Sequence, residues 1–391
     1  MATAPRASSV RADGLGQTLL AWYRRVGRDA RGLPWRLTRD PYAVWVSETM
    51  LQQTRVETVI PYYERFLREF PSVQALAEAP ADRVLAAWSG LGYYRRARML
   101  HAAAKTVSRE HAGRLPGDAA GLRALEGIGA YTAGAVASIA FGERAPLVDG
   151  NVARVLARLF AIRDDVNSGA GSRRIWAVAE GLVASVDGDP GDWNQALMEL
   201  GATVCLPGER ARCGECPVAS ACAARARGIV AALPRMPARK EPTPAARVAV
   251  VLASETHVVL ARRREAAGGG GLFGGLWEPP SGDAEALAAL CDALRVKPAV
   301  LKGRGVVEHV LSHRRLCITV YRGSVPRRRP TLPSVDYDAI ESVPLADLAA
   351  RGHARLTRKV LGQAGVAGLA EAPRAVGVSE RPRRGLRSTI S

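Results

Sequence analysis

The sequence predicts a multidomain protein, in which an all-α domain at residues 14–228 precedes a smaller α+β domain at residues 247–365. In the first segment apolar residues recur at helical spacing, and breakers separate the periodic stretches. One apolar stripe after the tetrapeptide VDGN comprises Val152, Val155, Leu156, Leu159 and Phe160. Beyond residue 246 the pattern changes to β-rich runs, RVAVVLAS, HVVLARRR and RRLCITVYRGS, with a helical candidate at 283–294.

Two segments lie outside these domains. Residues 229–246 contain four prolines and show no periodicity, which predicts an extended linker. Residues 371–391 are basic, rich in Arg, Pro, Gly and Ser, and poor in large apolar residues, so we expect a disordered tail.

The formal net charge of +18 indicates a polyanionic partner, with nucleic acid favoured over anionic lipid. The apolar runs are shorter than the roughly 20 residues of a membrane-spanning helix. Residues 1–16 also lack the apolar core of a secretory signal. We therefore expect a cytoplasmic protein with no membrane partner, and clustered cysteines in that compartment indicate a metal or redox centre rather than disulfides.

Four cysteines stand within CLPGERARCGECPVASAC, residues 205–222. Cys205, Cys213, Cys216 and Cys222 have the spacing C-x7-C-x2-C-x5-C, so four thiolates can ligate one centre. The single C-x-x-C suits a cubane iron–sulfur cluster or zinc, although structural zinc more often uses two such pairs. Four unrelated buried thiols remain the structural alternative. Because Arg210 and Arg212 lie between the cysteines, a metal centre here would hold a basic loop in shape.

Two carboxylates, those of Glu48 and Asp149, lie in different sequence environments. In YAVWVSETMLQQT, Glu48 shares a helical stripe with Val44 and Leu51, and burial there would raise its pKa, as a general acid at neutral pH requires. The alternative is that Glu48 lies at the edge of the stripe and pairs with an arginine. Asp149 precedes a helix as a natural N-cap, which favours an ionised carboxylate with a lowered pKa. If the two meet, they form an acid and a charge-stabilising group for glycosidic cleavage.

The stretch LEGIG, residues 125–129, lies between two helical segments. Gly127 and Gly129 allow a tight turn that presents N–H groups at a helix N-terminus, which is suited to a DNA phosphate. An ordinary helix connection would explain the same residues.

In their order along the chain, SETMLQQT, GLGYYRRARML, LEGIGAYTAGAV, VDGNVARVLAR and the cysteine loop resemble the helix-hairpin-helix DNA glycosylases with a 4Fe-4S cluster, most closely the MutY-type adenine DNA glycosylases. The resemblance covers residues 17 to 225 and continues into the second domain, where GGLWEPP and EHVLSHRRL resemble a Nudix-like lesion-recognition domain. It implies a nucleoid-associated monomer acting on double-stranded DNA with an A:8-oxoguanine or A:G mismatch. The implied reaction is base flipping followed by hydrolysis of the N-glycosidic bond, in base excision repair.

The resemblance also implies roles for individual residues. Glu48 matches the catalytic acid, Asp149 the aspartate that stabilises the positively charged sugar, and Asn151 its supporting asparagine. Tyr131 stands where lyase-competent relatives carry a lysine nucleophile, which implies a monofunctional glycosylase. The remaining matches are Gln53 and Tyr93 as duplex wedges, Trp35 and Arg36 as an adenine-pocket segment, Ser312 and His313 as the 8-oxoguanine-reading loop, and the four cysteines as cluster ligands, with a first gap one residue longer than usual.

Two other functions remain open. One is an endonuclease III-like glycosylase and lyase on oxidised pyrimidines, against which Tyr131 and the second domain argue. The other is a non-enzymatic DNA-binding redox sensor, which would use the cysteines and the positive charge but leave Glu48 without a role.

Overall fold

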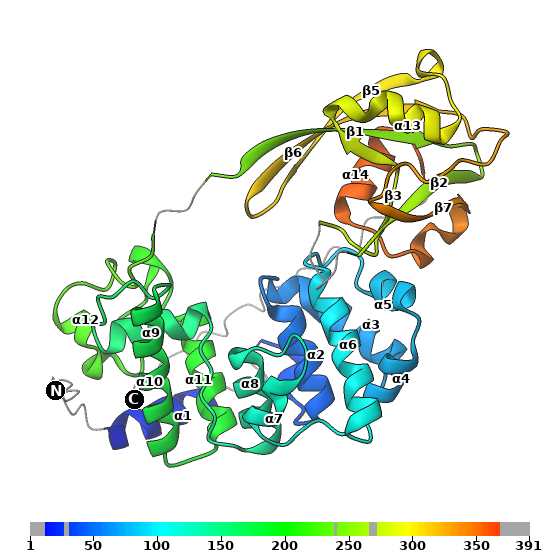
Figure 1. The fold of residues 1–391 in the computed structure, drawn as a ribbon. Coiled ribbons are helices and arrows are strands. Elements are labelled where there is room, and N and C mark those ends of the chain that lie inside the picture. The colour runs from blue at the N-terminus through cyan, green and yellow to red at the C-terminus, as the bar shows by residue number, and fades with distance from the viewer. Residues whose placement is uncertain (1–11, 27–30, 238–240, 266–271, 368–391) are drawn as a thin grey trace, which may run out of the picture.

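The computed structural model describes residues 12–26, 31–237, 241–265 and 272–367, and the predicted tail at 371–391 lies outside them. Helices make up the first part of the chain as far as Ala226, and two β-sheets with further helices make up the second (Figure 1). The fold class predicted from the sequence is confirmed. None of the helices within the described ranges has both the length and the apolarity to cross a membrane.

The helical part contains, in chain order, α1 (Ala12–Val26), η1 (Pro34–Arg36), α2 (Pro41–Leu51), α3 (Val56–Glu69), α4 (Val73–Glu78), α5 (Ala81–Ala87), α6 (Arg95–Glu110), α7 (Ala119–Ala124), α8 (Ala130–Phe141), α9 (Gly150–Leu159), α10 (Gly169–Ser185), α11 (Pro190–Thr203), η2 (Gly208–Arg210), η3 (Ala219–Ala221) and α12 (Ala223–Ala226). Several of these helices begin at a short polar residue whose side chain accepts an N–H of the first turn, which satisfies a donor that would otherwise be unpaired. These caps are Asp40, Ser72, Asp118, Asp149, Ser168 and Asp189.

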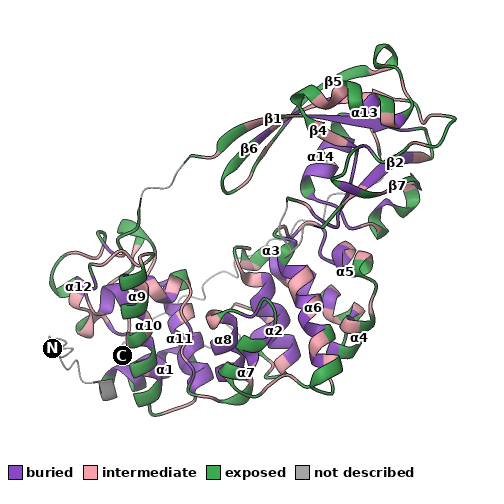
Figure 2. Cartoon of the chain, viewed as in Figure 1, coloured by how far each residue is buried: buried purple, intermediate pink, exposed green. Residues whose placement is uncertain are grey.

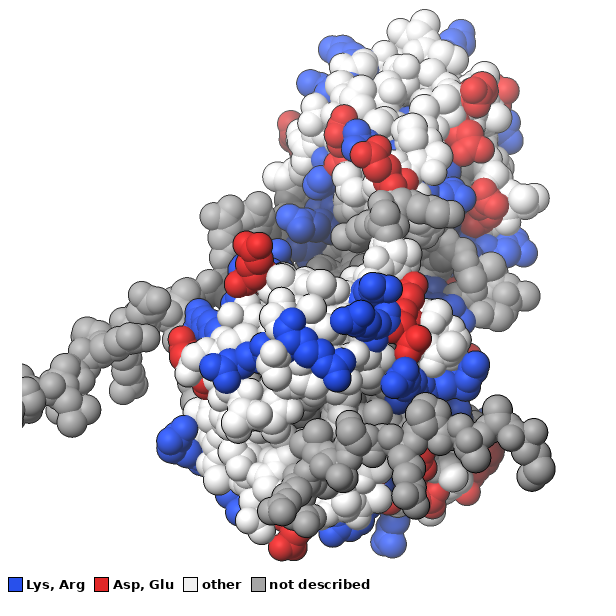
Figure 3. All heavy atoms as spheres, turned by 90° about the vertical axis from the view of Figure 1, so that its left-hand side faces the viewer, with Lys and Arg blue, Asp and Glu red and all other residues white. Residues whose placement is uncertain are grey.

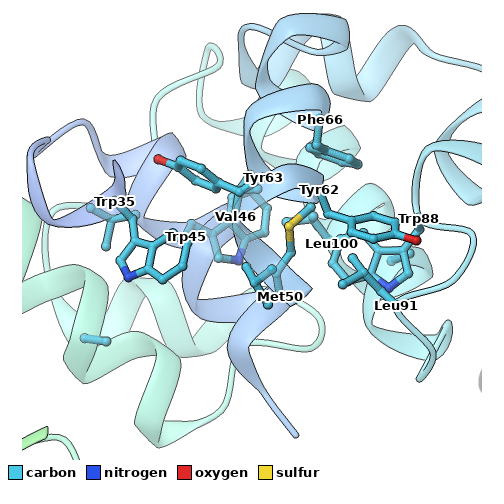
Figure 4. Close-up of a cluster of buried hydrophobic side chains, with 14 of the residues drawn as sticks. Trp35, Trp45, Val46, Met50, Tyr62, Tyr63, Phe66, Trp88, Leu91 and Leu100 are labelled. Carbon is cyan, nitrogen blue, oxygen red and sulfur yellow. The ribbon is translucent and has the colours of Figure 1, made fainter. Parts of the chain in front are cut away.

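Helix α2, which carries Glu48, lies inside the helical part (Figure 2). Every residue from Tyr42 to Met50 is buried, because α2 packs against α3, α6, α8 and η1. An aromatic and aliphatic cluster supports it, in which Trp35 meets Tyr63 edge to face at 5.5 Å and Phe66 meets Trp88 at 5.8 Å (Figure 4). The helix is thus buried all round rather than along one stripe, and its position is fixed by close packing.

The C-terminal part contains β1 (Thr243–Leu252), β2 (His257–Arg263), β3 (Trp277–Glu278), β4 (Ser281–Asp283), η5 (Ala284–Ala286), α13 (Leu287–Leu294), η6 (Pro298–Val300), β5 (Lys302–Val310), β6 (Arg314–Gly323), β7 (Tyr337–Pro344), η7 (Leu345–Ala350) and α14 (Arg355–Gln363). One sheet has the order β4-β1-β6-β5 and the other β3-β2-β7. Strands β1 and β6 are parallel, and the remaining pairs are antiparallel. The turn between β5 and β6 carries Ser312 and His313.

The prediction of an extended linker at residues 229–246 is wrong at both ends of the segment. Its first part packs on the helical part: Leu233 is buried and its carbonyl accepts from Arg158 Nε at 2.9 Å, while the Arg235 carbonyl accepts from Val166 N at 3.3 Å. Its last four residues, 243–246, belong to β1 and pair with residues 314–317 of β6. The prolines interrupt helix formation, but they leave the flanking backbone free to find tertiary partners.

The two parts meet along the loop before α6 and the start of that helix. Tyr94 Oη donates to the His353 carbonyl at 2.8 Å, and His353 N donates to Ser89 Oγ at 3.0 Å. Arg262 of β2 also reaches Asp82 of α5 at 3.7 Å. The C-terminal part is therefore docked on the segment that contains Tyr93.

Candidate active site

A cavity of about 180 Å³ opens between η1, α2, α8, α9 and α11. It is lined by residues that the sequence singled out separately: Trp35, Arg36, Glu48, Tyr131, Asp149 and Asn151. Glu48 and Asp149 lie 101 positions apart in the chain. Both carboxylates line one cavity, which the sequence alone does not show.

Glu48 is buried on α2 and accepts a hydrogen bond from Tyr131 Oη through Oε2. Desolvation raises the pKa of Glu48 to about 7. The Tyr131 hydroxyl and the charge of Arg36 oppose the rise, and the charge of Asp149 adds to it. A carboxyl with this pKa exchanges its proton near neutral pH.

The arginine beside Glu48 is held by another residue. Arg36 Nη2 pairs with Glu199 Oε2 at 3.0 Å, and Arg31 Nη1 reaches the same oxygen at 3.1 Å. Arg36 also donates to Tyr23 Oη at 3.1 Å. Arg36 therefore affects the pKa of Glu48 through its charge and is not its ion-pair partner. This arrangement differs from the alternative in which Glu48 lies at the edge of the apolar stripe and pairs with an arginine.

Asp149 caps α9 as expected: its Oδ1 accepts from Val152 N at 2.7 Å and its Oδ2 from Asn151 Nδ2 at 3.2 Å. The predicted lowering of its pKa is wrong. Burial raises the pKa of Asp149, and the hydrogen bonds from Val152 and Asn151 together with the charge of Arg154 only oppose that rise. The sequence shows that Asp149 occupies an N-cap position, but it does not show how deeply its carboxyl is buried in the cavity.

Sequence reasoning missed the arginines of α9. Arg154 Nη2 donates to Asn151 Oδ1 at 2.9 Å and to the Gly201 carbonyl at 2.7 Å, and its Nε donates to the Cys205 carbonyl at 2.8 Å. Gly201 allows α11 to approach, since a Cβ there would lie 2.7 Å from Asn151 Cβ. The sequence signal that could have revealed these arginines is their i, i+4 spacing, Arg154 and Arg158, within an otherwise apolar helix.

A second, smaller cavity of about 30 Å³ is lined by all four predicted ligands, Cys205, Cys213, Cys216 and Cys222. Its other walls are mainly apolar residues of α9, α11 and the loop itself. Arg158 is buried beside it and donates through Nη1 to Cys205 Sγ at 3.3 Å and to the Leu206 carbonyl at 2.7 Å. Among the described residues, no group of three His, Cys, Asp or Glu side chains is arranged to hold a single metal ion.

The predicted wedge residues lie on the surface with unusual backbone conformations. Gln53 has φ +57° and Tyr93 has φ +49°, a region that side-chain-bearing residues rarely adopt. Tyr93 Oη lies 3.3 Å from Ser312 Oγ, so the wedge loop and the predicted lesion-reading loop touch although 219 positions separate them. His313 is exposed beside Ser312, and its carbonyl accepts from Thr243 N at 3.1 Å.

The LEGIG turn forms the N-terminus of α8. Gly127 has φ +77°, where a Cβ would also strike Met99, and Gly129 is the N-cap residue. Both glycines are exposed, and a Cβ on Gly129 would meet open space. The first N–H groups of α8 thus face outward, on the helix whose next residues include Tyr131.

Two protein-family models match the chain. The model of the HhH-GPD superfamily base excision DNA repair proteins matches residues 46–179, and that of the NUDIX domain matches residues 247–363. The first match lies in the helical part and the second in the C-terminal part, so the chain is similar to an HhH-GPD domain followed by a NUDIX domain. The first match contains Glu48, Tyr131, Asp149 and Asn151.

Individual proteins similar to this chain include adenine DNA glycosylases. An adenine DNA glycosylase of Homo sapiens is 50% identical over 54% of this chain and 39% of its own length. One of Buchnera aphidicola subsp. Baizongia pistaciae is 40% identical over 53% of this chain and 57% of its own length. The matched part therefore spans about half the length of these relatives or less. A solved thermostable thymine-DNA glycosylase has a TM-score of 0.50 and 28% identity, and the match covers 56% of this chain and 99% of that one. The resemblance to adenine DNA glycosylases is confirmed.

Proposed function

We propose that the chain is a monofunctional adenine DNA glycosylase, which removes adenine mispaired with 8-oxoguanine or guanine by base flipping and hydrolysis of the N-glycosidic bond. The observation that carries this proposal is that Glu48 and Asp149 line one cavity, with Tyr131 between α2 and α9. The identity to curated adenine DNA glycosylases supports the choice of base.

The chemistry requires one proton donor and one negative charge. Adenine leaves poorly as an anion, so protonated Glu48 gives its proton to a ring nitrogen as the bond from the sugar carbon to N9 breaks and its electron pair moves to the base. The positive charge that develops on the sugar is stabilised by ionised Asp149. Water then adds to the sugar carbon, and its released proton returns to a carboxylate.

Tyr131 tunes the acid and supplies no amine. Its hydroxyl donates to Glu48 and lies 3.7 Å from Met198 Sδ, which holds the carboxyl in one orientation. Because a phenol cannot form a Schiff base with the sugar, the product is an abasic site in an intact strand.

Access to adenine requires that the base leave the helix stack, at a cost of about a few kcal/mol. In this proposal Gln53 and Tyr93 enter the duplex at the lesion, and Trp35 and Arg36 receive the flipped adenine. Ser312 and His313 would read the 8-oxoguanine left in the opposite strand, since Ser312 already lies against Tyr93.

The DNA backbone would be bound by the N-terminus of α8 at Gly127 and Gly129 and by the basic surface. Lys and Arg side chains are spread over the helical body in one view of the surface, with fewer Asp and Glu side chains among them (Figure 3). The net charge of +18 is consistent with steeply salt-dependent binding. We propose that the protein acts as a monomer associated with the nucleoid.

A 4Fe-4S cluster fits the cysteine cavity. The four thiols surround one mainly apolar cavity, which agrees with four thiolate ligands of a single cluster. Cys205, Cys213, Cys216 and Cys222 would hold it, and it would supply structural order to the loop at 205–222. Arg158 would donate to the Cys205 thiolate.

The test uses duplexes that carry adenine opposite 8-oxoguanine, guanine or thymine, incubated with the protein and analysed with and without alkali. We expect release of adenine opposite 8-oxoguanine and guanine, and strand breaks only after alkali. Breaks without alkali would indicate the lyase alternative. Binding without base release from any duplex would contradict the proposal and favour a DNA-binding sensor.

A further inference from the structure

Arg96 joins two surface segments, one of which contributes Leu51 and Thr54 to the lining of the candidate active site. It lies in the first turn of α6, with only 9% of its surface exposed. Its Nη1 donates to the carbonyls of Thr49 and Met50 at 2.8 and 2.7 Å and to that of Gln52. Because the last carbonyls of a helix lack partners within it, Arg96 closes the C-terminal end of α2, the helix of Glu48.

The second terminal nitrogen of the Arg96 guanidinium also donates to both surface segments. This nitrogen, Nη2, donates to Thr54 Oγ1 at 3.0 Å and to the Gly92 carbonyl at 3.2 Å. The guanidinium carbon lies 5.4 Å from the ring centre of Tyr93 and 5.5 Å from that of Trp88. One side chain therefore contacts the residues on either side of Gln53, and Tyr93 itself.

Both contacted segments contain strained backbone. The left-handed φ values of Gln53 and Tyr93 are unfavourable for residues with side chains, and such conformations persist only where the surroundings hold them. The donors of Arg96 bind carbonyls immediately before each of these residues, at Gln52 and Gly92. The guanidinium thus fixes the direction in which the chain leaves α2 and the direction in which it enters α6.

We propose that Arg96 is a positioning residue that holds Gln53 and Tyr93 at the separation at which both enter the duplex during base flipping; this rests on the proposed function. The planar fork of an arginine can bind several carbonyls at once, whereas the ammonium of a lysine is a compact point charge. Neighbouring residues extend the connection, because Tyr94 binds His353 and Tyr93 meets Ser312 in the C-terminal part. The start of α6 thereby links the lesion-reading loop to the helix of the catalytic acid.

The test measures flipping separately from chemistry. In a Glu48→Gln background, which keeps the substrate intact, 2-aminopurine next to the target adenine reports unstacking by a rise in fluorescence. We expect the rise with the Glu48→Gln protein and its loss with Arg96→Met and Arg96→Lys added, while duplex affinity changes by less than about tenfold. With Glu48 present, both Arg96 variants should lower single-turnover adenine release by about 10- to 100-fold, the scale of the flipping cost.

Arg65→Met is the matched control. Arg65 likewise stacks on a tyrosine, at 4.5 Å from the ring centre of Tyr62, and donates to a helix-terminal carbonyl, Ala87, at 3.2 Å, but it touches neither wedge segment. It should leave fluorescence and release unchanged. If Arg96→Met does not fold, Arg96→Lys is tested in a Tyr93→Ala background, where positioning through Tyr93 predicts a much smaller additional loss than in the parent chain.

Unchanged fluorescence and release in folded Arg96 variants would overturn the inference, as would full rescue by Arg96→Lys, since that would assign the residue a role of charge alone. If the parent protein itself neither unstacks nor releases adenine, the proposed function fails instead, and the two failures are distinguished.

Discussion

The two cavities of the helical part share helix α9 and differ in what burial does there. In the larger cavity, desolvation raises the pKa of Glu48 to about 7, within the range where a proton can be given and regained. In the smaller one, the same effect raises the pKa of the Cys216 thiol to about 11. The shift brings the carboxyl into the range of proton transfer near neutral pH, whereas it makes the unligated thiol harder to ionise. The same physical cause therefore has different consequences for the two groups.

Within the larger cavity, Asp149 and Glu48 differ in their polar partners. Asp149 has Val152 N, Asn151 and the charge of Arg154 to support its ionised form, while Glu48 receives one neutral phenol hydrogen bond. Arg154 contacts both Asn151 and the carbonyl of Cys205, so its guanidinium bridges the two cavities.

The largest expected effect concerns the acid. Glu48→Gln keeps the shape of the side chain but removes its transferable proton, so adenine release should fall by about 10²- to 10⁴-fold. Binding of the A:8-oxoguanine duplex should persist. Single-turnover release and a binding titration measure the two quantities, and an unaffected release rate would remove Glu48 from the catalytic assignment.

The same variant should be more stable than the parent at pH 8. Between the ordinary carboxyl pKa of 4.5 and the value of about 7 in the folded chain, the folded state retains a proton that the unfolded state has lost, so stability falls as pH rises through this range. A glutamine at position 48 does not ionise, so the variant does not undergo this loss of unfolding free energy, which amounts to on the order of 3 kcal/mol. Denaturant unfolding from pH 5 to 8 measures it.

Glu199→Gln, at the ion-pair partner of Arg36, is the control. It should be destabilising at pH 8, because Arg36 would lose its buried ion-pair partner. A stability difference between Glu48→Gln and the parent that does not grow with pH would contradict the buried-acid account.

At the second cavity, Cys216→Ser should remove iron and sulfide from the purified protein and disorder the loop that carries Arg210 and Arg212. If both arginines contact phosphates, the slope of log affinity against log salt should fall by about 2. Cys317→Ser, at a half-buried position on β6 outside the cavity, should change neither quantity. Stoichiometric zinc in the parent protein would refute the cluster.

The smallest effect is expected far from both cavities. Ser312→Ala removes one hydroxyl from the lesion-reading loop and should narrow the preference for 8-oxoguanine over guanine by a factor of about 3 to 10, the scale of one hydrogen bond. Ser254→Ala, in the β1–β2 turn, should leave the ratio as it is. An unchanged ratio in Ser312→Ala would remove this residue from lesion reading.

Local sequence patterns predicted the helical part, strands β1, β2 and β6, and the candidates Glu48, Asp149 and the four cysteines, whereas Trp35, Arg36, Tyr131 and Asn151 came from the family resemblance. Local patterns failed where the decisive contact is distant in the chain. Burial reversed the predicted pKa shift of Asp149, and Arg96, Arg154 and Glu199 act through carbonyls and ion pairs that sequence does not show. Strand β5 was missed because Gly303 and Gly305 weaken its pattern and most of it is exposed.

The most direct test of the account is the pH dependence of single-turnover adenine release from the A:8-oxoguanine duplex. The account predicts a rate that falls about tenfold per pH unit above about 7, as Glu48 loses its proton. This limb should disappear in the residual activity of Glu48→Gln. A rate that stays constant or rises from pH 7 to 9 would contradict a buried, protonated Glu48 as the acid.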